Sequence, residues 1–220
     1  MKSYGQFCSI ARALDLLGER WTILIVRELL CGGRTFGDVR RGIPRISRTM
    51  LSARLHELCD AGVIERRGLE GYELTESGRD LLGVVSALGT WGQKWLPRTV
   101  ERDELDMDAL LWDMRRRVDV EKLPQKPTVV RIELTDLRRG ATRWLLLRPS
   151  EVSLCGTNPG FPETLQVRTD RRTLIGWWRG DLSYAEARHR GLQLDGPAAL
   201  VRAFPSWFQR YLFADVARQE

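Results

Sequence analysis

One predicted helix, over residues 47–61, carries polar side chains opposite an apolar stripe. With Leu51 at the centre of the buried side, a step of about 100° per residue puts Leu55 and Leu58 beside it. Arg48 lies near the N-terminus of this helix, and the side opposite Leu51 carries Thr49, Ser52, Ala53 and His56. An arginine can form a bidentate contact with guanine, hydroxyl groups can hydrogen-bond bases or phosphates, and a small alanine permits close approach. These side chains are typical of a helix that reads DNA, although a merely solvated helix face would have a similar composition.

Arginine dominates the positive charge of the chain and is concentrated around this helix. The 220 residues contain 35 Lys and Arg against 29 Asp and Glu, a formal net charge of +6, and only four of the basic residues are Lys. Residues 34–67 hold eight Arg against four acidic residues, a local net charge of +4. A basic segment of this kind suits a polyanion. We therefore extend the predicted DNA contacts within and beside this segment to Arg45, Ser47, Arg54, Arg66, Arg67 and Tyr72.

Other kinds of chemistry find little support in the sequence. The motifs of serine hydrolases, zinc proteases and phosphate-binding loops are absent, so we expect no enzyme. Four scattered Cys and two His, with no Cys-x-x-Cys, predict neither a metal site nor a cofactor. The absence of a charged-then-apolar leader favours the reducing cytoplasm. No apolar run approaches the roughly 20 residues that span a bilayer, so we expect no membrane partner.

The elements around the DNA-reading helix are expected at short intervals. Apolar periodicity predicts helices over residues 8–17, 21–30 and 35–42, and Thr35 and Ser47 are suitable N-caps. Two strand-like runs, 63–66 and 71–74, flank a turn at 68–71 and form a short hairpin. A long helix then begins at Thr75 and ends before Pro97, with an apolar side formed by Leu81, Leu82, Val85, Leu88, Trp91 and Trp95. This order predicts a mainly α winged helix-turn-helix.

Motifs in this first half resemble one family when they are taken together. They lie at residues 14–22 (LDLLGERWT), 27–30 (RELL), 36–40 (FGDVR), 43–47 (IPRIS), 50–58, 62–66 and 72–78. Over about residues 4–96 the chain resembles the HxlR-type bacterial regulators, which are relatives of the MarR-type regulators. Two features depart from the family pattern: Ser9 stands where the family usually has Pro after its first Cys, and the wing is short. The resemblance implies a transcriptional regulator that binds DNA.

The hairpin and the first cysteine take candidate roles from this reading. Arg66, Arg67 and Tyr72 on the hairpin would contact phosphates, or Arg66 would instead form an ion pair within the protein. Cys8 occupies the position of a thiol that senses oxidants or electrophiles in some members of the family. Arg12, one helical turn further on, could lower the pKa of Cys8. Alternatively, Cys8 is a small core residue.

Assembly as a homodimer is expected on a pseudo-palindromic double-stranded DNA operator. One helix reads only a few base pairs, which supplies too little specificity alone. The helices over 8–17 and 75–96 would form the two-fold interface. Leu88, Trp91 and Trp95 make a stripe on the second of these helices that is too apolar to leave in water.

The second half has a different pattern of elements. A connector over residues 98–127 contains a predicted helix at 105–118 that packs with the domain following it, and strands are predicted at 130–134, 142–147, 151–155 and 164–169. Asp170 and Ser183 can cap two further helices. A short strand at 192–196 and a last helix at 198–204 complete the predicted elements.

Motifs of this half, at 167–170, 173–175, 178–187, 191–197 and 200–208, resemble the SCP2-like (sterol carrier protein type-two) fold over roughly residues 106–213. The resemblance implies an α+β domain with an apolar cavity for a hydrophobic small molecule. The expected walls of this cavity are Trp112, Val130, Ile132, Leu134, Leu145, Leu147, Trp177, Trp178 and Phe204. Alternatively, the Trp residues only fill a small core.

Three segments follow from these patterns: a winged-helix DNA-binding and dimerisation domain at 1–97, a connector at 98–127 and an SCP2-like domain at 128–220. The main hypothesis is a DNA-binding regulator whose second domain senses a hydrophobic molecule. One alternative is a thiol-based redox regulator that acts through Cys8 and has a passive second domain. Another is a carrier of hydrophobic ligands.

Overall fold

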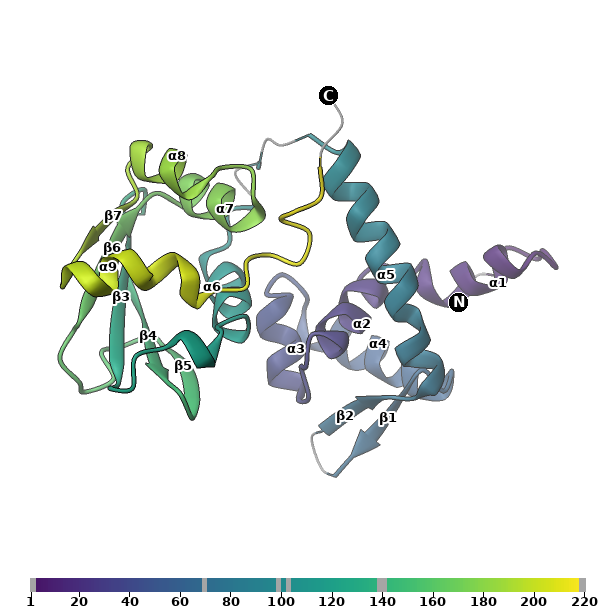
Figure 1. Ribbon diagram of the computed structural model, residues 1–220. Helices are drawn as coiled ribbons and strands as arrows, with labels where there is room; N and C mark the ends of the chain where they lie inside the picture. Colours follow the sequence, from purple (N-terminus) through teal and green to yellow (C-terminus); the bar gives the residue numbers. More distant parts are fainter. Residues whose placement is uncertain (1–2, 69–70, 98–99, 102–103, 138–141, 218–220) are drawn as a thin grey trace. The chain divides into compact units, whose positions relative to one another are not determined.

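The computed structural model describes residues 3–68, 71–97, 100–101, 104–137 and 142–217 (Figure 1). The chain divides into two compact units, Met1–Gly92 and Gln93–Glu220. The predicted domain boundary at 97 lies a few residues further along, and the segment 98–127, predicted as a connector, falls within the second unit. Residues 69 and 70 of the predicted wing turn lie outside the described residues. Within the described part of the chain, no helix combines the length and the apolar composition needed to cross a membrane.

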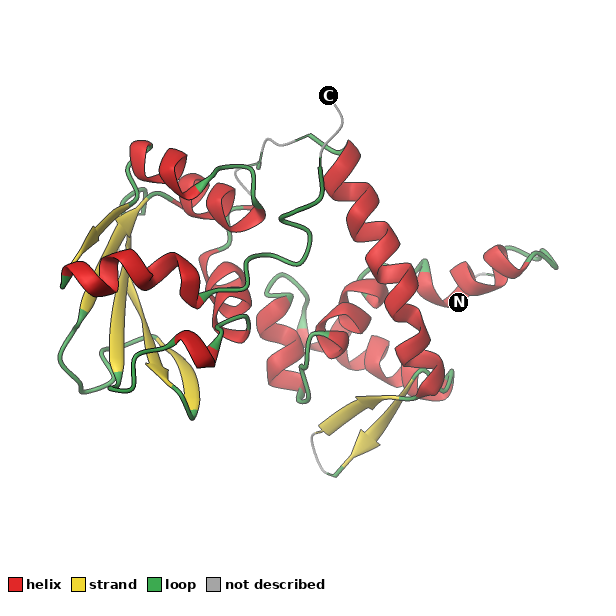
Figure 2. Ribbon diagram, viewed as in Figure 1, coloured by secondary structure: helices red, strands yellow, loops and turns green. Residues whose placement is uncertain are grey.

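The first unit has the predicted order of elements (Figures 1 and 2). The helices and strands are α1 (Ser9–Leu17), α2 (Thr22–Leu30), α3 (Phe36–Gly42), α4 (Arg48–Asp60), β1 (Ile64–Arg67), β2 (Gly71–Leu74) and α5 (Glu76–Trp95). The strands pair antiparallel, with Arg66 opposite Tyr72. The predicted winged helix-turn-helix is therefore confirmed.

Short polar contacts set the starts of α3 and α4. The Thr35 hydroxyl accepts a hydrogen bond from the Asp38 amide at 3.1 Å, and the Asp38 carboxylate accepts one from the Thr35 amide at 3.1 Å. This capping box begins α3. The Ser47 hydroxyl accepts a hydrogen bond from the Met50 amide at 3.1 Å and begins α4. Both predicted N-caps are confirmed.

The core of the first unit lies between α2, α3, α4 and the wing. Leu51, Leu55 and Leu58 of α4 are at most 1% exposed, as the predicted apolar stripe requires. They belong to one cluster with Ile25, Val26, Leu29, Val39, Ile43, Ile46, Val63, Ile64, Leu74 and Val85. The predicted apolar side of α5 only partly joins this core. Leu81 packs against the cluster, whereas Leu82, Leu88, Trp91 and Trp95 are each more than half exposed.

The second unit is a five-stranded sheet with helices (Figure 2). Its elements are α6 (Met107–Arg116), η2 (Val120–Lys122), β3 (Thr128–Leu134), β4 (Thr142–Arg148), β5 (Glu151–Cys155), β6 (Leu165–Thr169), α7 (Arg171–Arg179), α8 (Tyr184–His189), β7 (Gln193–Asp195), α9 (Ala198–Ala203) and η3 (Phe204–Trp207). The strand order is β5-β4-β3-β6-β7; β3 and β6 are parallel and the other neighbours are antiparallel. The predicted α+β class is confirmed, whereas the SCP2-like identity stays a prediction.

One face of this sheet forms the core of the second unit. Val130, Ile132 and Leu134 alternate along β3 toward this face and cluster with buried residues of α6 and α7. Trp177 of α7 lies amid the aromatic side chains, with ring centroids 5.8 Å from Tyr184, 5.8 Å from Phe204 and 6.1 Å from Phe208. The ring of Tyr184 is tilted against Trp177, that of Phe204 is stacked on it and that of Phe208 meets it edge to face, which are all favourable arrangements in an aromatic core.

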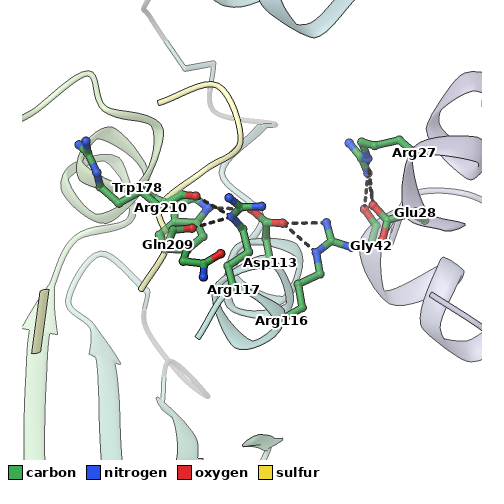
Figure 3. A network of polar contacts seen from close by, with 9 residues as sticks. All are labelled: Arg27, Glu28, Gly42, Asp113, Arg116, Arg117, Trp178, Gln209 and Arg210. Atoms are coloured by element: carbon green, nitrogen blue, oxygen red, sulfur yellow. Dashed lines mark hydrogen bonds and ion pairs between the residues drawn. The ribbon is translucent and has the colours of Figure 1, made fainter. Parts of the chain in front are cut away.

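Polar contacts tie α6 to α7 and to the C-terminal segment. The indole Nε1 of Trp178 donates to Asp113 Oδ2 at 2.7 Å, and Asp113 also pairs with Arg116 at 2.7 Å (Figure 3). Arg117 Nε donates to the carbonyl oxygens of Gln209 and Arg210 at 2.6 Å each. Helix α6 is thus an integral part of the second unit.

Candidate nucleic-acid interface

The side of α4 opposite its apolar stripe is open to solvent. Arg48, Thr49, Ser52, Ala53 and His56 are all exposed, and Arg45 and Ser47 are exposed in the turn that leads into the helix. The structure therefore brings together seven of the predicted contact residues on one helix and its leading turn. Near the C-terminal end, His56 Nε2 lies 3.4 Å from Asp60 Oδ2. The acidic end makes the N-terminal half of α4 the more favourable part for a polyanion.

A buried carboxylate fixes the packing of α2 on the end of α3. Glu28 on α2 is fully buried, and its Oε1 accepts hydrogen bonds from Arg27 Nε at 3.0 Å and Nη2 at 2.5 Å (Figure 3). Arg27 Nη2 also donates to the carbonyl oxygen of Gly42 at 3.1 Å. A Cβ atom at Gly42 would lie 1.8 Å from Glu28 Oε2. Only glycine therefore fits at position 42. Gly42 is also the last residue of α3, after which the turn toward α4 begins.

Arg54 takes a different position from the one the sequence analysis gave it. Its side chain is 11% exposed, and its guanidinium pairs with Glu19 Oε2 at 2.6 Å and Glu57 Oε2 at 2.5 Å. These partners hold the guanidinium at the side of α4, so we remove Arg54 from the proposed DNA contacts. A helical step count could have found this, because it places Arg54 only about 60° from Leu51 on the buried side.

The wing carries both arginines that the sequence predicted, but their surroundings differ. Arg67 is 62% exposed in its side chain and pairs with Glu65 at 2.8 Å and Glu73 at 3.2 Å. The ion pair considered for Arg66 is therefore seen at Arg67. Arg66 is exposed, and its positive charge acts on Cys59 at the end of α4.

Tyr72 anchors the wing to the body of the first unit. Its amide donates to the carbonyl oxygen of Arg34 at 2.8 Å, and Thr35 forms a bridge with Gly71. The Tyr72 side chain is half-buried and packs against the core cluster. The segment before α3 thus acts as a third strand beside the hairpin. Tyr72 fixes the wing, which leaves its ring only partly available to DNA.

Cys8 lies at the exposed N-terminal end of α1. The backbone amides of Ala11 and Ile10, which stabilise a thiolate, lower the pKa of Cys8 below its ordinary value. Arg12, the group that the sequence suggested for this effect, is not among these causes. Cys59 behaves differently, because burial raises its pKa. Among the described residues, no group of His, Cys, Asp and Glu is arranged to hold a metal ion.

The predicted cavity walls of the second unit lie mostly in its core. Ile132, Leu134, Leu145, Leu147, Trp177, Trp178 and Phe204, together with Val130, are each at most 2% exposed and belong to one cluster. Trp112 is not in that cluster, and the Arg115 guanidinium lies 4.8 Å above its ring. Two polar groups within the aromatic region, Trp207 Nε1 and the Tyr184 hydroxyl, are buried without a hydrogen-bond partner among the described residues.

Comparison with known proteins agrees with the geometry of the first unit. The family model of the HxlR-like helix-turn-helix matches residues 16–100. YodB of Bacillus subtilis, an HTH-type transcriptional regulator, is 36% identical over 89 residues, which are 38% of this chain and 80% of YodB. The chain belongs to the HxlR-like helix-turn-helix family of transcriptional regulators.

One further relative and one solved structure of YodB show the extent of the similarity to this HxlR-like chain. The uncharacterized HTH-type transcriptional regulator Rv3095 of Mycobacterium tuberculosis is 44% identical over 96 residues, which cover 41% of this chain and 60% of Rv3095. The crystal structure of quinone-bound YodB from B. subtilis is 38% identical, covers 39% of this chain and 97% of that one, and has a TM-score of 0.36. The family model thus covers the elements from the end of α1 through the whole of α5.

Proposed function

We propose that this HxlR-like protein is a transcription factor that binds double-stranded DNA through α4. The observation that carries the proposal is the division of α4 into two sides. One side fills the core with Leu51, Leu55 and Leu58, and the other presents Arg48, Thr49 and Ser52 to solvent. A helix held in this way can enter a major groove without disturbing the fold. Arg48 would fork onto a base edge, while Ser47 and Arg45 in the leading turn would contact phosphates.

The operator would be bound by a homodimer formed through α1 and α5. Leu88, Trp91 and Trp95 are 53%, 57% and 54% exposed, and they follow one another along one side of α5. On α1, Ile10 is 71% and Leu14 is 43% exposed. Apolar stripes of this kind on two helices of one unit support burial against a second copy. Two copies of α4 would then read two half-sites of a pseudo-palindrome.

The test begins with in vitro selection of duplexes from a random pool by the full-length protein. Binding of the selected duplex is then measured by fluorescence anisotropy over a range of salt concentrations. Arg48→Ala should weaken this duplex by about 5- to 150-fold, which corresponds to the roughly 1–3 kcal/mol of a base contact. Arg190→Ala in the second unit removes the same charge and serves as the matched control, with a change below about 2-fold. Equal effects of the two variants would refute the role of α4.

Cys8 supports a second candidate function, sensing of an electrophile or oxidant. A reactive thiolate needs access to solvent and a lowered pKa. Cys8 is exposed, and the backbone amides at the start of α1 lower its pKa. YodB, a relative of this chain, has been crystallised in a quinone-bound form. Modification of Cys8 would place a new group at the start of the helix that we propose for the dimer interface. Such a change would alter the spacing of the two reading helices.

The second unit supports a third candidate function, which rests on its SCP2-like resemblance. In this candidate, a hydrophobic molecule that carries a hydrogen-bond acceptor binds the second unit and regulates DNA binding. Trp207 Nε1 and the Tyr184 hydroxyl are buried donors without partners among the described residues, beside the rings of Phe204 and Trp177. A carbonyl or carboxylate on an otherwise apolar molecule would satisfy them. Native mass spectrometry of the purified full-length protein should then detect a bound small molecule that Trp207→Phe loses. Unchanged occupancy in Trp207→Phe would refute the contact with Trp207, and a parent protein without any bound molecule would leave the unit as a scaffold.

A further inference from the structure

Arg54 connects the DNA-reading helix to a turn that is distant in the sequence. Its Nη2 lies 2.6 Å from Glu19 Oε2, and its Nε donates to the carbonyl oxygen of Arg20 at 3.3 Å. Both partners lie in the turn between α1 and α2. Its Nη1 lies 2.5 Å from Glu57 Oε2, one turn further along α4. A planar guanidinium satisfies these acceptors together, which an ammonium group cannot do with the same geometry.

The turn that holds Arg54 is itself fixed. Trp21, the residue after Arg20, has φ of 81°, a left-handed backbone conformation that is costly for a bulky side chain. Such a conformation persists only where its surroundings hold it. Here the indole of Trp21 packs against the core, and the Arg20 guanidinium lies 4.8 Å above its ring. The turn therefore provides a fixed point against which α4 can be set.

The place of Arg54 on α4 explains what this contact controls. Arg54 lies at the flank of the stripe formed by Leu51, Leu55 and Leu58, while Ser52 and His56 are exposed on the other side. Apolar contacts are non-directional, so the stripe alone permits small rotations of α4 about its axis. Glu57 lies on α4 itself and only orients the guanidinium, whereas the bonds from Arg54 to Glu19 Oε2 and to the Arg20 carbonyl oxygen reach another segment and are directional. They select one rotation and so one direction for the side chains that face the DNA.

We propose that Arg54 is a positioning residue for DNA reading, which sets the rotation of α4 through Glu19 and the carbonyl oxygen of Arg20. The proposal rests on the proposed function, because it concerns how α4 is presented to DNA. Glu19 lies two residues after Leu17, the last residue of α1, so the same contact links the helix proposed for the dimer interface to the helix proposed to read bases. A shift of α1 then changes the setting of α4.

The first arm of the test replaces Arg54 in the full-length protein. Arg54→Met keeps an apolar stem but removes the charge and all donors. Affinity is measured for a duplex selected by the parent protein and for a random-sequence duplex of the same length. The selected duplex should bind roughly 2- to 30-fold more weakly, the range found for residues that couple sites without touching ligand. The random duplex and the salt slope should barely change. Equal loss for both duplexes with a salt slope smaller by about one would instead identify a phosphate contact and overturn the proposal.

The second arm uses the sign of the effect at Glu19. Neutralising a carboxylate near a polyanion should by itself strengthen DNA binding. If Glu19 positions Arg54, Glu19→Gln should weaken binding of the selected duplex and leave or strengthen that of the random duplex. Asp80→Asn, an exposed carboxylate on α5, is the control that removes the same charge, and it should not weaken either. A Glu19→Gln variant that behaves like Asp80→Asn overturns the proposal.

Two further measurements separate positioning from a loss of folding. Arg54→Lys keeps the charge but cannot satisfy all three acceptors, so it should restore only part of the specific affinity. The double variant Glu19→Gln with Arg54→Met should be no weaker than Arg54→Met alone, because both changes break one contact. Additive losses, or losses matched by a lower melting temperature in both single variants, contradict the proposal. If the parent protein itself selects no sequence, the proposed function fails before Arg54 is examined.

Discussion

The contact between Glu28 and Gly42 gives a quantitative prediction for the stability of the first unit. In Gly42→Ala the new Cβ would lie 1.8 Å from Glu28 Oε2 and 2.1 Å from its Cδ. Two atoms that are not bonded cannot approach so closely, so the Glu28 carboxylate must leave the position in which Arg27 holds it. The carboxylate is fully buried, with a side-chain exposure of 1%, so it cannot find water nearby.

The size of the effect follows from the environment of this pair. Breaking a buried ion pair and leaving one charge without its partner costs about 3–5 kcal/mol. Alanine in a helix gains up to about 1 kcal/mol over glycine where its conformation is allowed, which offsets part of this cost. Since Arg27 is 34% exposed in its side chain and keeps some hydration, the lower part of the range applies. Gly42→Ala should therefore reduce the free energy of unfolding by about 2–4 kcal/mol.

Urea unfolding of the full-length protein, followed by the helical circular dichroism signal, measures this loss. Gly37→Ala on the same helix is the matched control, because its Cβ would meet nothing closer than 3.6 Å. It should be neutral or slightly stabilising. Glu28→Ala combined with Gly42→Ala should be no less stable than Glu28→Ala alone, because the clash is gone. A Gly42→Ala protein with the unfolding midpoint of the parent would refute this account of the α2–α3 contact.

Three other predictions concern assembly, acid stability and the thiol. Leu88→Glu on the exposed side of α5 should give a monomer in light scattering at micromolar concentration, and a dimeric Leu88→Glu would contradict the proposed interface. Burial raises the pKa of Asp38, but hydrogen bonding with Thr35 and with the Arg34 amide, and the charge of Arg41, outweigh it and lower that pKa. Asp38→Asn should then cost about 1 kcal/mol above about pH 4, and the difference from the parent should vanish as the pH falls through the lower folded-state pKa. Cys8→Ser should abolish any effect of benzoquinone on binding of the selected duplex; an unchanged response would exclude Cys8 as the sensor.

Much of the first unit could be predicted because its local signals agree with its packing. Thr35 and Ser47 have side chains that cap helices, and both do so in the structure. The spacing of Leu51, Leu55 and Leu58 specifies one buried side of α4, and the exposed polar face follows from it. The strands of the second unit were also found, because Val130, Ile132 and Leu134 alternate with polar residues as a one-sided sheet requires.

The contacts that set the angles between elements were not predictable in the same way. Glu28 and Gly42 are fourteen positions apart, and nothing in their spacing shows that a carboxylate fills the place of a missing Cβ. Trp21 adopts a left-handed backbone that no propensity would assign to tryptophan. The sequence showed that one side of α5 is apolar. Its periodicity does not distinguish an apolar side that packs in the core from one that stays exposed on the unit.

The distribution of charge is the feature in which the sequence and the structure differ most. The net charge of +4 over residues 34–67 treats every arginine as equal. In the structure at least three of them have carboxylate partners: Arg41 with Asp38, Arg54 with Glu19 and Glu57, and Arg67 with Glu65 and Glu73. An arginine that already shares its charge with two carboxylates attracts a phosphate weakly, because the local field is nearly cancelled. We therefore expect the wing to contribute less to DNA affinity than its arginine content suggests, and exposed Arg48 at the start of α4 to remain the main candidate.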